Sequence, residues 1–95
     1  MNKYEGIIIF KGDLNEEQLE KEYAKTEELV KKQEAKIEKS EKWGKKKLTF
    51  EIDKFRDGFF LYVAFEALPG SIKTLTDTFK LDNNILRAQI IRLEK

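Results

Sequence analysis

The sequence predicts an α+β fold of the ferredoxin-like type, a β-α-β-β-α-β sandwich with a four-stranded antiparallel sheet and two helices on one face. Three observations lead to this class. The hydrophobic periodicity alternates between strand-like and helix-like segments in that order. The run FFLYVAF, residues 59–65, is apolar on both faces of a strand although 39% of the chain is charged, so both faces must be covered. The 95 residues suffice for one core, and we expect a single domain over residues 1–95.

The first strand is predicted over residues 4–10, YEGIIIF, because large apolar groups occupy both of its alternating faces. Asn15 and Gln18 have the spacing of a capping box, which predicts that a helix begins at Glu16. Helical spacing gives this helix one buried stripe, which consists of Leu19, Tyr23, Thr26 and Val30. The helix is expected to end near residues 33–35.

The next two strands are predicted to form a hairpin. Residues 37–52 combine period-two apolar positions with many charges, which is typical of an edge strand, and residues 39–47 are expected to bulge or loop out. Residues 53–58 are interpreted as a long turn. The apolar third strand follows over residues 59–67.

A second helix and a fourth strand complete the predicted order. Pro69 and Gly70 interrupt the chain, and Ser71 is expected to cap a helix of about three to four turns. The apolar positions of this helix are Ile72, Leu75 and Phe79. Residues 82–84 are interpreted as a turn, and residues 85–93 as the last strand.

Right-handed crossovers in both halves place the two helices on the same face of the sheet, with the first and third strands at its centre. The helix side is then lined by Ile8, Phe10, Leu61, Val63, Phe65, Ala88 and Ile90. The opposite side carries Ile7, Ile9, Phe60, Tyr62, Gln89 and Ile91. An uncovered apolar patch of this kind exceeds what a monomer usually exposes, and we expect it to be an interface.

The composition argues against an enzyme. The sequence has no histidine and no cysteine, which removes the commonest general base, the commonest metal ligand and all thiolate nucleophiles. The five glycines are scattered, so no loop can cradle a phosphate group. We expect no catalytic residues, no metal, no cofactor and no small-molecule substrate. The chain opens without a basic and apolar leader, and its apolar runs are far shorter than the roughly 20 residues of a membrane helix. We therefore expect a cytoplasmic protein with no membrane partner.

Basic residues gather in the second strand and at strand ends. Trp43-Gly44-Lys45-Lys46-Lys47 places three cations beside an aromatic ring, and Lys54, Arg56 and Arg87 could join them. Cations in such a pattern contact phosphates without reading a sequence. An equally open alternative is that the lysine run is a solvated edge that prevents aggregation. The net charge is +1, so the placement of the charges matters more than their number.

Two other functions also stay open. Residues 56–65 come near the signature with which RNA-recognition motifs stack bases on a sheet, but the aromatic residues fall out of register and divide between the two faces. An independent single-strand RNA binder of that type is one alternative. The other is a homo-oligomeric ferredoxin-fold regulatory module that covers its sheet with a second copy.

Four segments together resemble one known family. They are Lys3-Tyr4-Glu5, residues 43–52 (WGKKKLTFEI), Gly58-Phe59-Phe60 and Asn84-Ile85-Leu86-Arg87. The resemblance is to bacterial small-subunit ribosomal protein number six, and it covers essentially the whole chain. Residues 44–52 carry its most specific part.

The resemblance implies a non-catalytic, ribosome-bound component of the small subunit that acts in translation. It further implies that the protein forms a heterodimer with small-subunit ribosomal protein number eighteen and that the pair binds the central domain of the small-subunit ribosomal RNA. By position, the implied RNA-binding residues are Lys46, Lys47 and Arg87, with Lys3, Lys45, Lys54 and Arg92 as weaker candidates. The residues expected to dock the partner are Ile7, Ile9, Phe60, Tyr62 and Ile91.

Four positions depart from the family pattern. Lysine stands at positions 46 and 47, where the family usually has arginine, so that bidentate contacts with phosphate become point charges. Glu51 replaces a frequent proline, which changes an edge strand little. Glu34 stands where a helix-ending glycine is common, so no glycine marks the end of the first helix.

Overall fold

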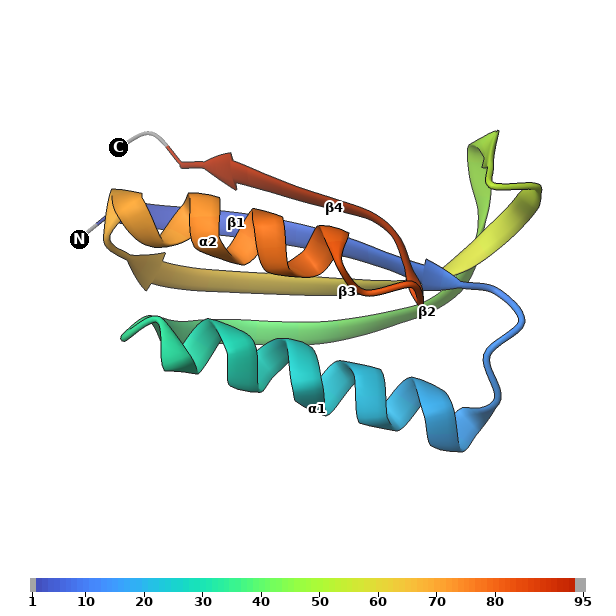
Figure 1. The fold of residues 1–95 in the computed structure, drawn as a ribbon, viewed down its shortest axis with the longest axis horizontal. Coiled ribbons are helices and arrows are strands. Elements are labelled where there is room, and N and C mark those ends of the chain that lie inside the picture. The colour runs from blue at the N-terminus through green and yellow to red at the C-terminus, as the bar shows by residue number, and fades with distance from the viewer. Residues whose placement is uncertain (1, 94–95) are drawn as a thin grey trace.

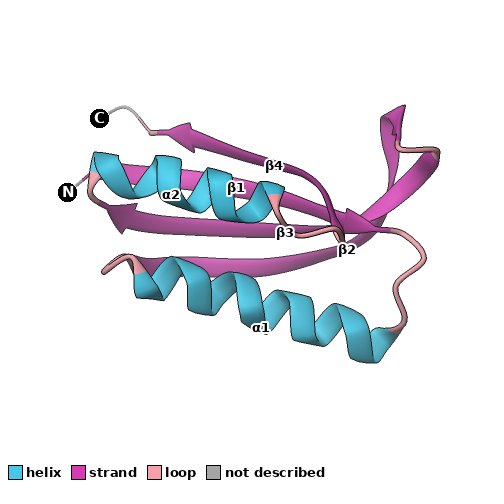
Figure 2. Cartoon of the chain, in the orientation of Figure 1, coloured by secondary structure: helices cyan, strands magenta, loops and turns pink. Residues whose placement is uncertain are grey.

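Strands and helices follow one another in the predicted order in a computed structural model that describes residues 2–93 (Figure 1). The elements are β1 (Asn2–Lys11), α1 (Glu16–Lys32), β2 (Lys36–Ile52), β3 (Phe55–Ala67), α2 (Pro69–Lys80) and β4 (Ile85–Arg92). The strands form one antiparallel sheet in the order β2-β3-β1-β4. Both helices contribute to a single core on one face of this sheet, which confirms the ferredoxin-like fold (Figure 2).

The two most apolar strands lie at the centre of the sheet, as predicted. β1 pairs with β3 along its whole length, from Asn2 opposite Ala67 to Lys11 opposite Gly58. On its other edge β1 pairs with β4. β2 is an edge strand, which fits its high content of charged residues because charges on an edge discourage pairing with another chain.

The core lies between the sheet and the helices and uses the predicted side chains. Those from β1 and β3 have at most 2% of their surface exposed, and they are Ile8, Phe10, Leu61, Val63 and Phe65. The predicted stripe of α1, from Leu19 to Val30, is also buried. Phe10 meets Tyr23 edge to face, with 5.6 Å between the ring centroids. Burial of each large apolar side chain contributes roughly 1.5–3 kcal/mol, so this interface dominates the stability of the domain.

Both ends of α1 are defined by local hydrogen bonds. The capping box is present: the Asn15 side chain accepts from the Gln18 backbone N–H at 2.8 Å, and the Gln18 side chain accepts from the Asn15 N–H at 3.1 Å. The helix ends at Lys32, just before the predicted range. Glu34 then adopts a φ of 59°, the left-handed conformation that glycine usually provides after a helix. The helix therefore stops at this position without glycine.

The connection between β2 and β3 corrects the predicted long turn over residues 53–58. Asp53 and Lys54 alone form the turn, with φ values of 48° and 70°, and Ile52 pairs with Phe55. Positive φ at both central residues matches the twist of a hairpin. The polar residues 56–58 resembled a loop in the sequence, but they continue β3 as a bent ribbon. Figure 1 shows the end of this hairpin curling away from the rest of the sheet.

β2 keeps its pairing through the segment that was expected to bulge or loop out. Register shifts occur between Ile37 and Lys39 and between Lys42 and Gly44, so the segment bulges but stays in the sheet. Gly44 has a φ of 81°, which glycine adopts without strain. At the second shift, Trp43 is the extra residue of β2, because no residue of β3 is paired with it.

The predicted cap of the second helix is wrong. α2 begins at Pro69, two residues before Ser71, and its N-cap Leu68 makes no side-chain hydrogen bond. Proline has the helical φ and lacks the N–H that a cap would satisfy, so it starts the helix by itself. The Ser71 hydroxyl donates instead to the Gln33 carbonyl oxygen at 3.4 Å, which ties the two helix ends together.

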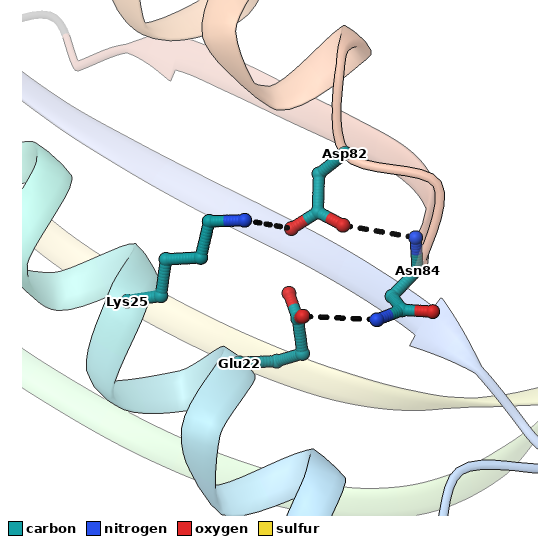
Figure 3. Close-up of polar contacts among 4 residues, drawn as sticks. All are labelled: Glu22, Lys25, Asp82 and Asn84. Carbon is teal, nitrogen blue, oxygen red and sulfur yellow. Dashed lines mark hydrogen bonds and ion pairs between the residues drawn. The ribbon is translucent and has the colours of Figure 1, made fainter.

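A polar cluster joins α1 to the turn before β4 (Figure 3). Glu22 accepts from the Asn84 side chain at 3.0 Å, and Asp82 accepts from the Lys25 ammonium at 3.3 Å. Glu22 is 8% exposed, and one of its carboxylate oxygens has no partner among the described residues. Burial and the neighbouring Asp82 raise the pKa of Glu22. Burial acts against it, but the neighbouring Glu22, the hydrogen bond from the Asn84 backbone N–H and the Lys25 charge hold the pKa of Asp82 below its usual range.

Replacing Glu22 by glutamine is expected to stabilise the protein at neutral pH. Because the folded pKa of Glu22 is raised, its favourable contribution is complete below the unfolded pKa and is lost as the pH rises through the folded pKa. The neutral amide avoids burying a charge and can still accept from Asn84. We expect the free energy of unfolding to increase by about 1 kcal/mol at neutral pH, and the gain to vanish below about pH 4.

Urea denaturation between acidic and neutral pH measures this effect. Glu38→Gln is the matched control, because Glu38 is exposed and should change stability little at any pH. A loss of stability in Glu22→Gln at neutral pH would mean that the fold needs the Glu22 charge, against the expectation.

Gly58 is expected to tolerate no side chain. A Cβ atom there would lie 2.7 Å from both the Ile9 Cγ2 atom and the Phe10 carbonyl oxygen. The backbone oxygen cannot move freely, so Gly58→Ala should lower the free energy of unfolding by about 1–3 kcal/mol. Gly70→Ala meets open space in α2 and should be neutral or slightly stabilising. Equal thermal unfolding midpoints for the two variants would contradict this reading of the packing.

Candidate interaction surface

The sheet face opposite the helices, here named the open face, gathers residues from all four strands. The pairing register places on it Lys3, Glu5, Ile7 and Ile9 of β1, Phe60, Tyr62, Ala64 and Glu66 of β3, Lys39, Glu41 and Lys46 of β2, and Arg87, Gln89 and Ile91 of β4. Trp43 joins them because its ring stacks on Tyr62. Both helices pack on the other side, so the open face has no helix over it within residues 2–93.

The residues predicted to dock a partner differ in exposure. Ile7, Phe60 and Tyr62 are half-buried, and Ile91 is 47% exposed. Ile9 lies on the same face but is 9% exposed, because it packs against Gly58, whose missing side chain leaves room for it. Ile9 therefore supports this surface more than it contributes to it, and the available apolar surface lies around Ile7, Phe60 and Ile91.

A row of side chains crosses the open face from β2 to β1. The Lys46 ammonium lies over the Trp43 ring, 5.0 Å from its centroid. The Trp43 ring stacks on Tyr62 with 5.2 Å between centroids and 5° between ring planes. The Tyr62 hydroxyl donates to the Glu5 carboxylate at 2.5 Å. The row is therefore held together by a cation–π contact, an aromatic stack and a charge-assisted hydrogen bond.

The charges next to this row alter two ionisable groups. The hydrogen bond to Glu5 raises the pKa of the Tyr62 phenol, because the donated proton is harder to remove. The Trp43 indole N–H donates to Glu41 at 3.0 Å, and the Lys39 ammonium lies 3.3 Å from the same carboxylate. Both contacts lower the pKa of Glu41, so this carboxylate is charged at neutral pH.

The basic residues predicted to bind RNA do not form one patch. Because side chains alternate along a strand, the register places Lys3, Lys46 and Arg87 on the open face. It places Lys45, Lys47 and Arg92 on the helix side, and Lys54 lies in the hairpin turn. The Lys45 ammonium stacks over Phe59, 5.7 Å from the ring centroid. The cations are thus spread over both faces of the sheet and lie mainly on its two edge strands, β2 and β4.

Sequence reasoning missed the roles of Trp43 and Glu5 on the open face. The sequence places Trp43 beside the lysine run but does not indicate that it belongs to the docking surface. Simple alternation from Ile37 would place it on the helix side, because the register shift between Ile37 and Lys39 is what brings Glu41 and Trp43 to the open face. A second shift follows between Lys42 and Gly44. A glycine directly after an aromatic residue in an edge strand was the available signal, since glycine in a strand often marks a bulge.

Two further features bear on what this protein can do. Within residues 2–93 no group of three or more acidic, histidine or cysteine side chains is placed to hold a metal ion. Neither helix of the described part of the chain is long and apolar enough to span a membrane.

Comparison with known proteins finds relatives along the whole chain. The family model described as Ribosomal protein S6 matches residues 3–92. The small ribosomal subunit protein bS6 of Clostridium acetobutylicum is 35% identical over 95 residues, covering 100% of both chains. That of Parabacteroides distasonis is 37% identical over 95 residues, covering 100% of this chain and 80% of the relative. The crystal structure of 30S ribosomal protein S6 from Thermotoga maritima aligns with a TM-score of 0.92 at 25% identity, over 97% of this chain and 87% of that one.

These matches first define the class: the chain is a ribosomal protein of the small subunit, built on a ferredoxin-like domain. The family match over residues 3–92 and the full-length relatives then show that the chain belongs to the ribosomal protein S6 family. The resemblance seen in the sequence is thereby confirmed. As a member of this family, the protein is a structural component of the ribosome.

The Trp43 stack is expected to contribute measurably to stability. Trp43→Ala removes the contact with Tyr62 and the support for Lys46, and should lower the free energy of unfolding by about 0.5–1.5 kcal/mol. Phe50→Ala on the same strand is the control, because Phe50 is 75% exposed and should change stability by less than about 0.5 kcal/mol. Denaturant titration gives both values, and equal losses would contradict a specific role for the stack.

Proposed function

We propose that this protein binds the central domain of the small-subunit ribosomal RNA as half of a heterodimer with small-subunit ribosomal protein number eighteen. In this role it is non-catalytic and cytoplasmic. The observation that carries the proposal is the open face: a domain of the ribosomal protein S6 family leaves one side of its sheet without its own cover. A partner on that side would bury apolar surface that the isolated chain exposes.

The composition of the open face supports a protein partner. Phe60 and Ile91 offer apolar surface, while Glu41 and Lys46 surround it with charges. A mixed surface with aromatic residues at its centre and charges at its rim is typical of interfaces that form between separately folded proteins. An obligate apolar interface would carry fewer charges.

The distribution of basic residues supports RNA binding by the pair rather than by the single chain. Lys46 and Arg87 lie on the open face, and Lys47 lies on the other side of the β2 edge. Few phosphates can be contacted from such scattered positions on a chain of net charge +1, so the isolated protein should bind RNA weakly. A basic partner on the open face, between β2 and β4, would join the separate cations into a continuous surface.

The open face is poorly suited to independent base stacking. Phe59 and Phe60 point to opposite sides of the sheet, as the sequence indicated. One side of the Tyr62 ring is already occupied by Trp43. RNA-recognition motifs need free aromatic surfaces in register, and Phe60 alone does not supply them.

Charge removal at the proposed RNA contacts should weaken RNA binding by the pair. The triple variant Lys46→Ala, Lys47→Ala and Arg87→Ala is expected to lower the affinity of the heterodimer for a central-domain RNA fragment by about 10- to 100-fold at fixed salt. The slope of log affinity against log salt concentration should become shallower by about two to three, because each lost phosphate contact removes about one unit of slope. Filter binding at several salt concentrations measures both quantities.

The matched control removes the same number of charges from α1, with Lys21, Lys31 and Lys32 replaced by alanine. It should bind RNA within about threefold of the unchanged heterodimer. RNA binding by the isolated chain as tight as that of the pair would instead favour an independent RNA binder. A stable homodimer in sedimentation would favour the homo-oligomeric alternative.

A further inference from the structure

Glu5 is the one acidic side chain in the middle of the apolar part of the open face. Its direct neighbours across the sheet are Ala64 on β3 and Ile91 on β4. Ile7 follows it on the same face of β1, and the Tyr62 side chain reaches it from β3. A protein that covers Ile7 and Ile91 must therefore also cover the Glu5 carboxylate.

The hydrogen-bonding capacity of Glu5 is partly unused. Tyr62 donates to one carboxylate oxygen at 2.5 Å. Within residues 2–93, no side chain forms a hydrogen bond with the other oxygen, and none forms an ion pair with Glu5. In the isolated chain, water can solvate that oxygen because Glu5 is only half-buried. Docking would remove this water, and a carboxylate that loses its water without gaining a cation is strongly unfavourable.

We propose that Glu5 is the charged anchor of the open face, and that the protein which docks there places an arginine or lysine side chain on the free oxygen of the Glu5 carboxylate. This inference rests on the proposed function, and it names the chemistry by which the open face selects its partner. Tyr62 holds the carboxylate in one orientation, so that the anchor is positioned before the partner arrives.

The same carboxylate disfavours other occupants of the open face. RNA brings phosphate groups, which Glu5 and Glu41 repel. A second copy on a two-fold axis brings a second Glu5 to the same region, so that like charges approach each other. A basic protein segment is the occupant whose charge complements this centre, whereas the RNA contacts are made by the cations of the two edge strands.

Calorimetric titration of the full chain with small-subunit ribosomal protein number eighteen from the same organism tests the inference. Glu5→Gln keeps an acceptor for Tyr62 but removes the charge, and it should weaken binding by about tenfold or more. Tyr62→Phe keeps the charge and removes the hydrogen bond, and should weaken binding by about threefold or less. Glu66→Gln removes a charge from the end of the same face and should also stay within about threefold.

A double-mutant cycle identifies the cation on the partner. Each lysine and arginine of the partner is replaced by alanine and titrated against the unchanged chain and against Glu5→Gln. One of these partner variants should bind both forms of the chain with the same affinity, because the pair it would form with Glu5 is already broken. Circular dichroism of each variant ensures that a loss of binding is not a loss of fold.

The outcomes separate the inference from the proposed function. If the unchanged chain binds the partner tightly and Glu5→Gln binds equally well, the proposal that Glu5 is the anchor is wrong, whereas the proposed heterodimer is supported. Equal losses in Glu5→Gln and Tyr62→Phe would also overturn it, because the hydrogen bond rather than the charge would then matter. If the unchanged chain does not bind the partner at all, the proposed function itself fails.

Discussion

The whole structure depends on one constraint: two helices can cover only one face of a four-stranded sheet. β1 and β3 at its centre carry large apolar groups on both faces, and the helices bury one set completely. Phe10 and Leu61 have no exposed surface at all. The apolar groups on the other face have no second layer within the described chain. The fold thus creates a stable core on one face of the sheet and leaves apolar surface on the other face that the described chain does not cover.

The open face is neither a dry core nor an ordinary polar surface. Trp43 covers part of Tyr62, and Tyr62 in turn binds Glu5, so that some apolar surface is shielded by contacts between neighbouring strands. These contacts order the side chains before any partner is present. Ordered side chains lose less conformational entropy on binding, which favours association with a partner of matching shape and charge.

Bulges in β2 decide how the charges of the edge are distributed. The register shift between Lys42 and Gly44 directs Lys46 toward the open face, where Trp43 also lies, while Lys42 points to the helices and lies over Tyr23, 5.1 Å from its ring centroid. A lysine run that reads as one cluster in the sequence is therefore divided between two faces. The open face and the helix side of β2 therefore present different members of the run.

The sequence by itself determined the order of elements, the central position of the apolar strands, the buried stripe of α1 and its capping box. These features depend on periodicity and on hydrogen bonds between residues a few positions apart. A short stretch of the sequence is therefore enough to predict them. The turn at Asp53 and Lys54, the direction of Trp43 and the contact of Tyr62 with Glu5 were decided by the tertiary structure. The tertiary structure also decided the contact of Glu22 with Asn84, which joins residues 62 positions apart. Such contacts follow from strand register and from the packing of helix on sheet, and both are fixed only when distant segments meet.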